Sequence, residues 1–137
     1  MTSSDVEGIT SKPSSSSVDE TLRRLEQAVS SRGLTVFARF DHSDEATGVG
    51  MAMQPAHVLV FGNPRAGTPL MVASPLVALE LPLRALVWQD GDGQVWVSYP
   101  NAALVAERFG LAPDLANVLG AVAGIVRAAL HGAASGG

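Results

Sequence analysis

The chain has 137 residues, of which 47% are hydrophobic, and a formal net charge of −4 at pH 7. This length and composition suit one globular domain with a substantial core. The acidic balance and the single lysine argue against a nucleic-acid or membrane-surface partner, because both need clustered Lys and Arg. The absence of cysteine excludes disulfides and zinc–thiolate sites and suits a reducing compartment.

The ends of the chain differ in composition from its middle. Residues 1–6 and 132–137 are small, polar or glycine-rich, which predicts disordered ends around a single domain at residues 7–131. The N-terminal sequence lacks the basic start and apolar core of a secretory signal. We therefore expect a cytoplasmic protein.

The first third of the chain predicts a helix and a strand. Residues 8–13 suit either a loop or an edge strand. Ser17 and Glu20 then fit a capping box ahead of an apolar stripe of helical spacing, and Arg32-Gly33 is a typical helix ending. Residues 34–40 alternate two mostly apolar sets, which predicts a strand with one face buried and the other partly covered.

The middle of the chain predicts a second strand followed directly by a helix. The polar loop at 41–55 has room for one helical turn near 44–48, and residues 56–61 form an apolar strand pattern. Asn63-Pro64 and Thr68-Pro69 are alternative helix starts, because proline loses no hydrogen bond at the first helical position. We favour Asn63-Pro64, with Pro69 bending the helix and Pro75 closing it.

A β-hairpin is the clearest signal of the second half. Gly91-Asp92-Gly93 separates strand patterns at 85–90 and 94–99, each with one tryptophan. A short helix is predicted at 101–109, and Pro113 begins a longer helix that reaches residue 130. The order of elements predicts an α+β fold, with a five-stranded, mostly antiparallel, curved sheet, helices on one face and a further C-terminal helix.

The long C-terminal helix carries a row of small residues four apart. Glycine inside a helix costs about 1 kcal/mol relative to alanine, so two glycines in one row indicate that something approaches closely. Either the protein's own sheet or a second subunit would fit. The row consists of Ala116, Gly120, Gly124 and Ala128.

Three ordered blocks of the sequence resemble one family. They are GLTVFARFDH at 33–42, FGNPRAGTPLM at 61–71 and LPLRALVW at 81–88. Together they are similar to the DUF302 family of bacterial and archaeal proteins, a domain of unknown function, over about residues 8–111. The resemblance implies a compact TBP-like β-α-β4-α fold, often dimeric, and no established reaction, cofactor or catalytic residue.

The strand-to-helix junction after residue 61 is the first candidate site. Asn63, Arg65, Gly67 and Thr68 place an amide, a guanidinium and a hydroxyl around a helix N-terminus, where an anion can bind. A phosphate loop is excluded because its lysine is missing after Gly67. The competing interpretation is that Asn63 only caps the helix and Gly67 only allows close packing.

Asp41 and His42, at the end of the first long strand pattern, are the second candidate. A carboxylate beside an imidazole can support proton transfer, but the same residues are common turn formers. A metal site needs about three converging ligands and only His57 stands near, so we expect no metal and no other cofactor.

The function that these patterns favour is a small, soluble, homodimeric binding or sensing module for a small ligand, with an anion as the class that the junction suits. Its predicted ligand-binding residues are Asp41, His42, Asn63, Arg65, Gly67 and Thr68. The alternatives are an enzyme that acts on a small organic substrate with His42 and Asp41, and a structural interaction protein.

Overall fold

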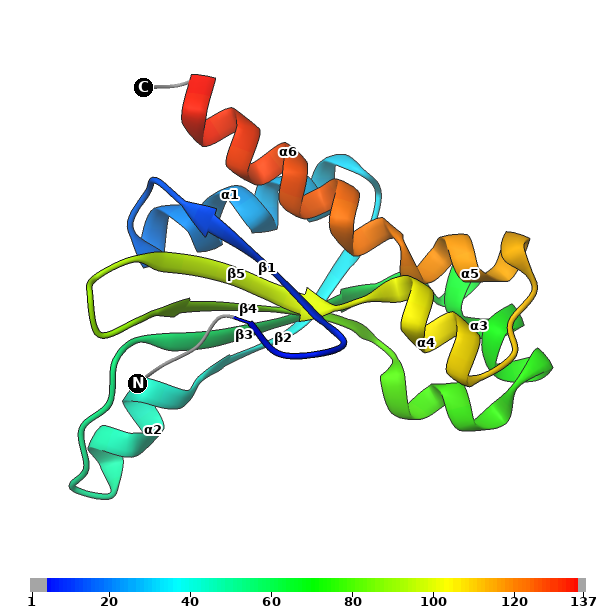
Figure 1. The fold of residues 1–137 in the computed structure, drawn as a ribbon, viewed down its shortest axis with the longest axis horizontal. Coiled ribbons are helices and arrows are strands. Elements are labelled where there is room, and N and C mark those ends of the chain that lie inside the picture. The colour runs from blue at the N-terminus through cyan, green and yellow to red at the C-terminus, as the bar shows by residue number, and fades with distance from the viewer. Residues whose placement is uncertain (1–4, 136–137) are drawn as a thin grey trace.

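The computed structural model describes residues 5–135 of the chain. Within these residues, one five-stranded sheet is accompanied by six α-helices and one 3-10 helix (Figure 1). In chain order the elements are β1 (Ile9–Ser14), α1 (Val18–Ser31), β2 (Thr35–Asp41), α2 (His42–Gly48), β3 (Ala56–Gly62), α3 (Pro64–Ala73), the 3-10 helix η1 (Pro75–Glu80), β4 (Leu83–Gln89), β5 (Val95–Pro100), α4 (Ala102–Arg108), α5 (Pro113–Leu119) and α6 (Ala121–Ser135).

The sheet has the strand order β1-β5-β4-β3-β2, and every neighbouring pair is antiparallel. This arrangement confirms the predicted α+β class, and the segment that suited either a loop or an edge strand is the edge strand β1, at residues 9–14. Helices α1 and α6 pack on each other and against the sheet, while α3, η1, α4 and α5 gather at one end and α2 lies at the other (Figure 1).

The core lies between the sheet and the α1–α6 pair. Alternate residues of each central strand face these helices, because successive strand side chains point to opposite faces of a sheet. The apolar stripe of α1 faces them in turn, at the helical spacing that the sequence predicted. The largest core side chains with almost no exposed surface are Leu25, Val29, Leu59, Phe61, Leu70, Val77, Val87, Val97, Ile125 and Val126.

The cap of α1 forms as predicted in one half only. The Ser17 hydroxyl accepts a hydrogen bond from the Glu20 backbone N–H at 3.1 Å. The Glu20 carboxylate does not complete a capping box but pairs with Arg23 and Arg24 one turn further along the helix. Opposite charges at these spacings lie on one face of a helix, so the ion pairs compete with the reciprocal cap bond.

A β-bulge in β2 changes which side chains face the core. Val36 lies opposite Phe61 and Ala38 lies opposite Val60, so Phe37 is an additional residue in this strand. Val36 and Ala38 therefore point to opposite faces, although strict alternation along the strand would place both on one face. Phe37 is 49% exposed, which agrees with a partly covered face.

The face of the sheet opposite α1 and α6 has no helix across it in the described residues. Trp88 and Trp96 are cross-strand partners on this face, with ring centroids 6.4 Å apart. Each indole N–H has a partner on the sheet or its turn: Trp88 donates to the Ser98 hydroxyl and Trp96 to the Asp90 carboxylate. Phe40, at the other edge of the sheet, is 48% exposed.

The predicted helix at 113–130 is two helices. α5 ends at Leu119, and α6 begins after Gly120. The two segments pack on different partners, α5 against α3 and α4, and α6 against α1 and the sheet, so the chain changes direction at a residue that tolerates a kink. Pro113–His131 is long and apolar enough to cross a membrane, by length and composition only. A partly buried helix of a globular domain meets the same two criteria.

Within the row of small residues on α5 and α6, Gly124 meets a side chain from another helix. A Cβ at Gly124 would lie 2.8 Å from a guanidinium nitrogen of Arg32, and that guanidinium donates to the Gly124 carbonyl at 3.2 Å. The group that approaches Gly124 is thus the end of α1, and not the sheet or a second subunit as predicted.

Helix α6 continues to Ser135, four residues into the predicted disordered tail. Residues 1–4 and 136–137 of the predicted ends lie outside the described part.

Candidate functional site

The turn from β3 into α3 is organised by Asn63. Its side-chain carbonyl accepts from the Arg65 N–H at 3.0 Å, and its backbone carbonyl accepts from the N–H groups of Ala66 and Gly67. Pro64 follows at the first helical position, where a proline loses nothing. The helix therefore starts where the sequence predicted, and Asn63 is its cap.

A cavity of about 210 Å³ lies beside this turn. Its walls come from the bulge of β2, the start of α3, the residues between η1 and β4, and α5. Most of the lining is apolar, and the Asn63 amide and the Thr68 hydroxyl are its polar side-chain groups. The lining residues are Phe37, Gly62, Asn63, Pro64, Gly67, Thr68, Met71, Leu81, Pro82, Leu83 and Val118.

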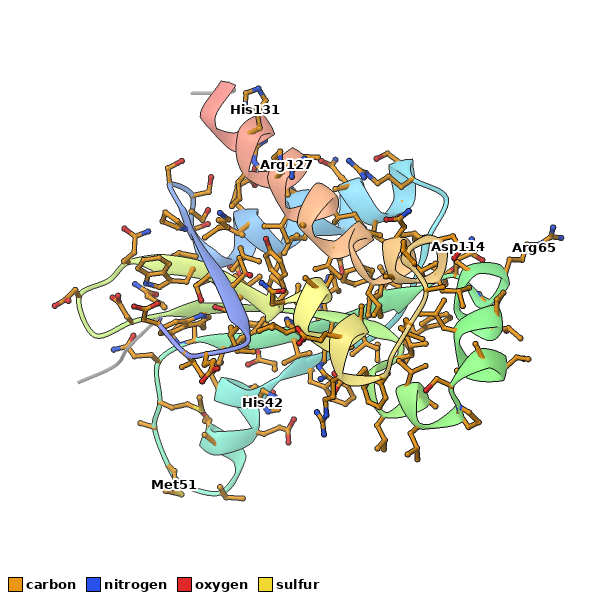
Figure 2. The ribbon with its side chains drawn as sticks, turned by 45° about the vertical axis from the view of Figure 1, so that its right-hand side comes forward. His42, Met51, Arg65, Asp114, Arg127 and His131 are labelled. Carbon is orange, nitrogen blue, oxygen red and sulfur yellow. The ribbon has the colours of Figure 1, made fainter. Side chains whose placement is uncertain are left out.

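The structure brings three of the predicted site residues together and separates the other three. Asn63, Gly67 and Thr68 line this cavity. Arg65 does not line it; its side chain extends away from the body of the molecule at the outer end of α3 (Figure 2). No charged residue therefore lines the cavity. The Arg65 guanidinium, on which the predicted anion site depended, points away from it.

Asp41 and His42 lie at the opposite end of the sheet, at the start of α2. The Asp41 carboxylate accepts from the Ser43 hydroxyl at 2.6 Å and from the Asp44 N–H at 2.9 Å, which makes Asp41 the cap of α2. These hydrogen bonds hold the pKa of Asp41 below its usual range. The bond from the Ser43 hydroxyl has the largest effect, and nearby His57 has a smaller one.

The imidazole beside Asp41 belongs to His57 on β3 rather than to His42. Its Nδ1 lies 3.8 Å from the Asp41 carboxylate. This nitrogen is buried and has no hydrogen-bond partner in the described structure. His42 is exposed on the first turn of α2, so the geometry does not join Asp41 and His42 into a pair for proton transfer.

A larger hollow lies on the helix side of the molecule, and none of the predicted site residues lines it. It has a volume of about 660 Å³ and runs between α6, the β1–β5 edge of the sheet and the start of α4. Lys12 on β1 and Arg127 and His131 on α6 bring positive or ionisable groups to it. The spacing of Arg127 and His131, four residues apart on one helix face, is the one signal in the sequence that points here.

No group of three or more His, Cys, Asp or Glu side chains with metal-ligand geometry occurs among the described residues.

Comparison with known proteins gives a family and a fold. A family model described as "Domain of unknown function DUF302" matches residues 10–130. A solved structure titled as an uncharacterized conserved DUF302 protein from Bacillus stearothermophilus superposes with a TM-score of 0.76 over 92% of this chain and 98% of that one, at 20% identity. At this identity the likeness speaks for the fold alone.

Two similar curated proteins carry a functional name. Proteins named fluoride-specific ion channel FluC 1 from Brucella suis and from Brucella abortus are each 40% identical to this chain over 111 residues. The match covers 80% of this chain but 44% and 41% of those proteins, so the chain spans less than half the length of either relative.

Proposed function

The chain belongs to the DUF302 family, and we propose that it is a binding or sensing module for a small, largely apolar molecule that carries one hydrogen-bonding group. The observation that supports this function is the cavity of about 210 Å³ beside the β3–α3 turn. Its apolar walls suit a group about the size of a benzene ring, which fills a cavity of roughly 150 Å³ in another protein. Asn63 and Thr68 line this cavity, and we expect their amide and hydroxyl to orient such a ligand.

The test uses benzyl alcohol, an aromatic ring with one hydroxyl, as the probe. Amide resonances of the isotope-labelled chain should shift around Phe37, Thr68 and Val118 on titration. Gly67→Leu places a side chain in the cavity and should abolish these shifts. Val72→Leu, on the exposed side of α3 with Val72 77% exposed, is the matched control and should leave them unchanged. Equal shifts in both variants would refute the proposed site.

A second candidate function follows from the relatives named as fluoride channels. More than half of each relative lies outside the match. We propose that the matched region serves in those proteins as an accessory domain that binds a ligand, and that this chain provides the same domain. Deletion of the matched region from the Brucella suis protein should preserve fluoride efflux from liposomes and change only its regulation. Loss of conduction in a deletion variant that inserts correctly would overturn this assignment.

We also propose that two copies of the chain associate through the sheet face opposite α1 and α6. This face carries the stacked tryptophans and the half-exposed Phe40. A twofold interface brings the same patch of both subunits together, so the patch must be complementary to itself. An apolar patch is self-complementary because it needs no opposite charges on its partner. Native mass spectrometry of the untagged chain should show a dimer that Phe40→Glu converts to a folded monomer; a wild-type monomer at micromolar concentration would exclude the interface.

A further inference from the structure

We infer that the groove between α6 and the β1–β5 edge binds a small molecule that has an anionic group on a short apolar body. This site is separate from the cavity at the β3–α3 turn, with which it shares no lining residue. Its volume of about 660 Å³ lies within the usual range of roughly 300–1,000 Å³ for small-molecule sites.

The charges of the groove differ from those of the rest of the surface. Five arginines pair with glutamates elsewhere: Arg23 and Arg24 with Glu20, Arg39 with Glu26, and Arg84 and Arg108 with Glu80. Among residues 5–135, no carboxylate pairs with Lys12 or Arg127, and no Asp or Glu lines the groove. Two of the cations left unpaired in an acidic chain therefore face one hollow.

These two cations come from different elements that line the groove. Lys12 comes from the edge strand β1. Arg127 comes from α6, where it lies one turn before His131 (Figure 2). A lysine on an edge strand also discourages pairing with another sheet, but that role does not require a second unpaired cation in the same groove. An anion between Lys12 and Arg127 would receive charge-assisted hydrogen bonds from both side chains.

Tyr99 adds a hydrogen-bond donor to the wall. The side chain lies at the β1–β5 edge and is 7% exposed. Burial raises the pKa of its phenol, and the positive charge of Arg127 acts in the opposite direction. At neutral pH the phenol is protonated and able to donate to an anion.

The remaining lining accounts for the apolar body of the ligand. Leu119, Val126 and Leu130 come from α5 and α6 and present hydrocarbon to the groove. A free inorganic anion would leave this surface unused. The combination favours carboxylates and phosphate monoesters with a short aliphatic or aromatic part.

The test compares probes with the same chain and different head groups. Octanoate, octyl phosphate and octyltrimethylammonium are each titrated into the labelled full-length chain below their micelle concentrations. We expect the two anions to shift resonances of β1, Tyr99 and α6, and to bind more weakly as salt is added. We expect the cation to cause no such shifts. Binding of octyltrimethylammonium at equal affinity, or anion shifts confined to other elements, would overturn the inference.

Charge-neutral variants test the two cations directly. The double variant Lys12→Gln/Arg127→Gln should weaken octanoate binding by at least about ten-fold. Arg65→Gln removes an unpaired cation that does not line the groove and should bind as the wild type does. Neither groove cation has an ion-pair partner in the described structure, so the double variant should keep the wild-type unfolding temperature. Unchanged octanoate affinity in a folded double variant would refute the site.

Discussion

Replacement of Gly67 by alanine tests whether the cavity at the β3–α3 turn is open in solution. Gly67 lies inside α3, and its φ is not in the left-handed region, so its backbone does not require glycine. A Cβ at this position would have Leu81 Cδ1 as its nearest neighbour, at 3.8 Å, which is an ordinary contact. Alanine therefore fits without displacement of any neighbour.

The structure predicts opposite effects of Gly67→Ala on stability and on binding. Alanine should stabilise the helix by about 0.5–1 kcal/mol relative to glycine. In a domain of this size that gain corresponds to a rise in unfolding temperature of about 2–5 °C. The added methyl group occupies roughly 30 Å³, the share of one water molecule, and so should weaken binding of benzyl alcohol by about ten-fold.

Urea denaturation followed by tryptophan fluorescence measures the first effect, and the amide titration measures the second. Ala66→Gly, one position earlier on α3, is the control and should destabilise the chain by a similar amount. If Gly67→Ala is less stable than the wild type, Leu81 packs closely on Gly67 in solution and the cavity is absent. A stabilised variant with unchanged affinity for benzyl alcohol would place the ligand elsewhere.

Three further outcomes test the electrostatics and packing of the fold. Hydrogen bonds from the Trp96 indole first, and then from backbone N–H groups of the turn, hold the pKa of Asp90 below its usual range. The stability that the ionised Asp90 contributes should thus be complete above about pH 4 and fall as the pH drops through the lower folded-state pKa. The NMR resonance of the Trp96 indole N–H should shift with this titration, and the shift should be absent in Asp90→Asn. Thr21→Val removes the partner of the buried Ser14 hydroxyl at 2.8 Å and should cost about 1–3 kcal/mol in urea denaturation; a neutral effect would show that water replaces the lost bond. Phe61→Ala should cost about 3–5 kcal/mol by the same measurement, because Phe61 is fully buried in the sheet core, and a loss below about 1 kcal/mol would contradict that position.

Local hydrogen bonding explains which parts of the fold the sequence predicts well. Ser17 and Asn63 cap the helices that follow them, and the Gly91-Asp92-Gly93 turn joins the two strands of the hairpin. In each case the deciding groups are within four residues of one another, so no knowledge of distant segments is needed. The antiparallel sheet follows from the order of such elements together with the explicit hairpin.

The candidate site at the β3–α3 turn was predictable in part for the same reason. Asn63, Gly67 and Thr68 belong to one turn and the first residues of one helix, so their proximity is a local property. The direction of the Arg65 side chain is not a local property. A helix places successive side chains about 100° apart, and only packing decides which side of the helix faces the protein. The apolar walls at Phe37, Leu83 and Val118 come from three distant segments.

What the sequence by itself determined is most of the helices and strands, the caps at Ser17 and Asn63, the hairpin turn and the family. Only the tertiary structure decided the bulge at Phe37, the break at Gly120 and the groove between Lys12 and Arg127. Each of these depends on segments far apart in the chain that meet when the core closes. The residue pattern of one segment reports only the periodicity of that segment. The strand register, the direction of a helix and the position of unpaired charges depend on the other segments that pack against it.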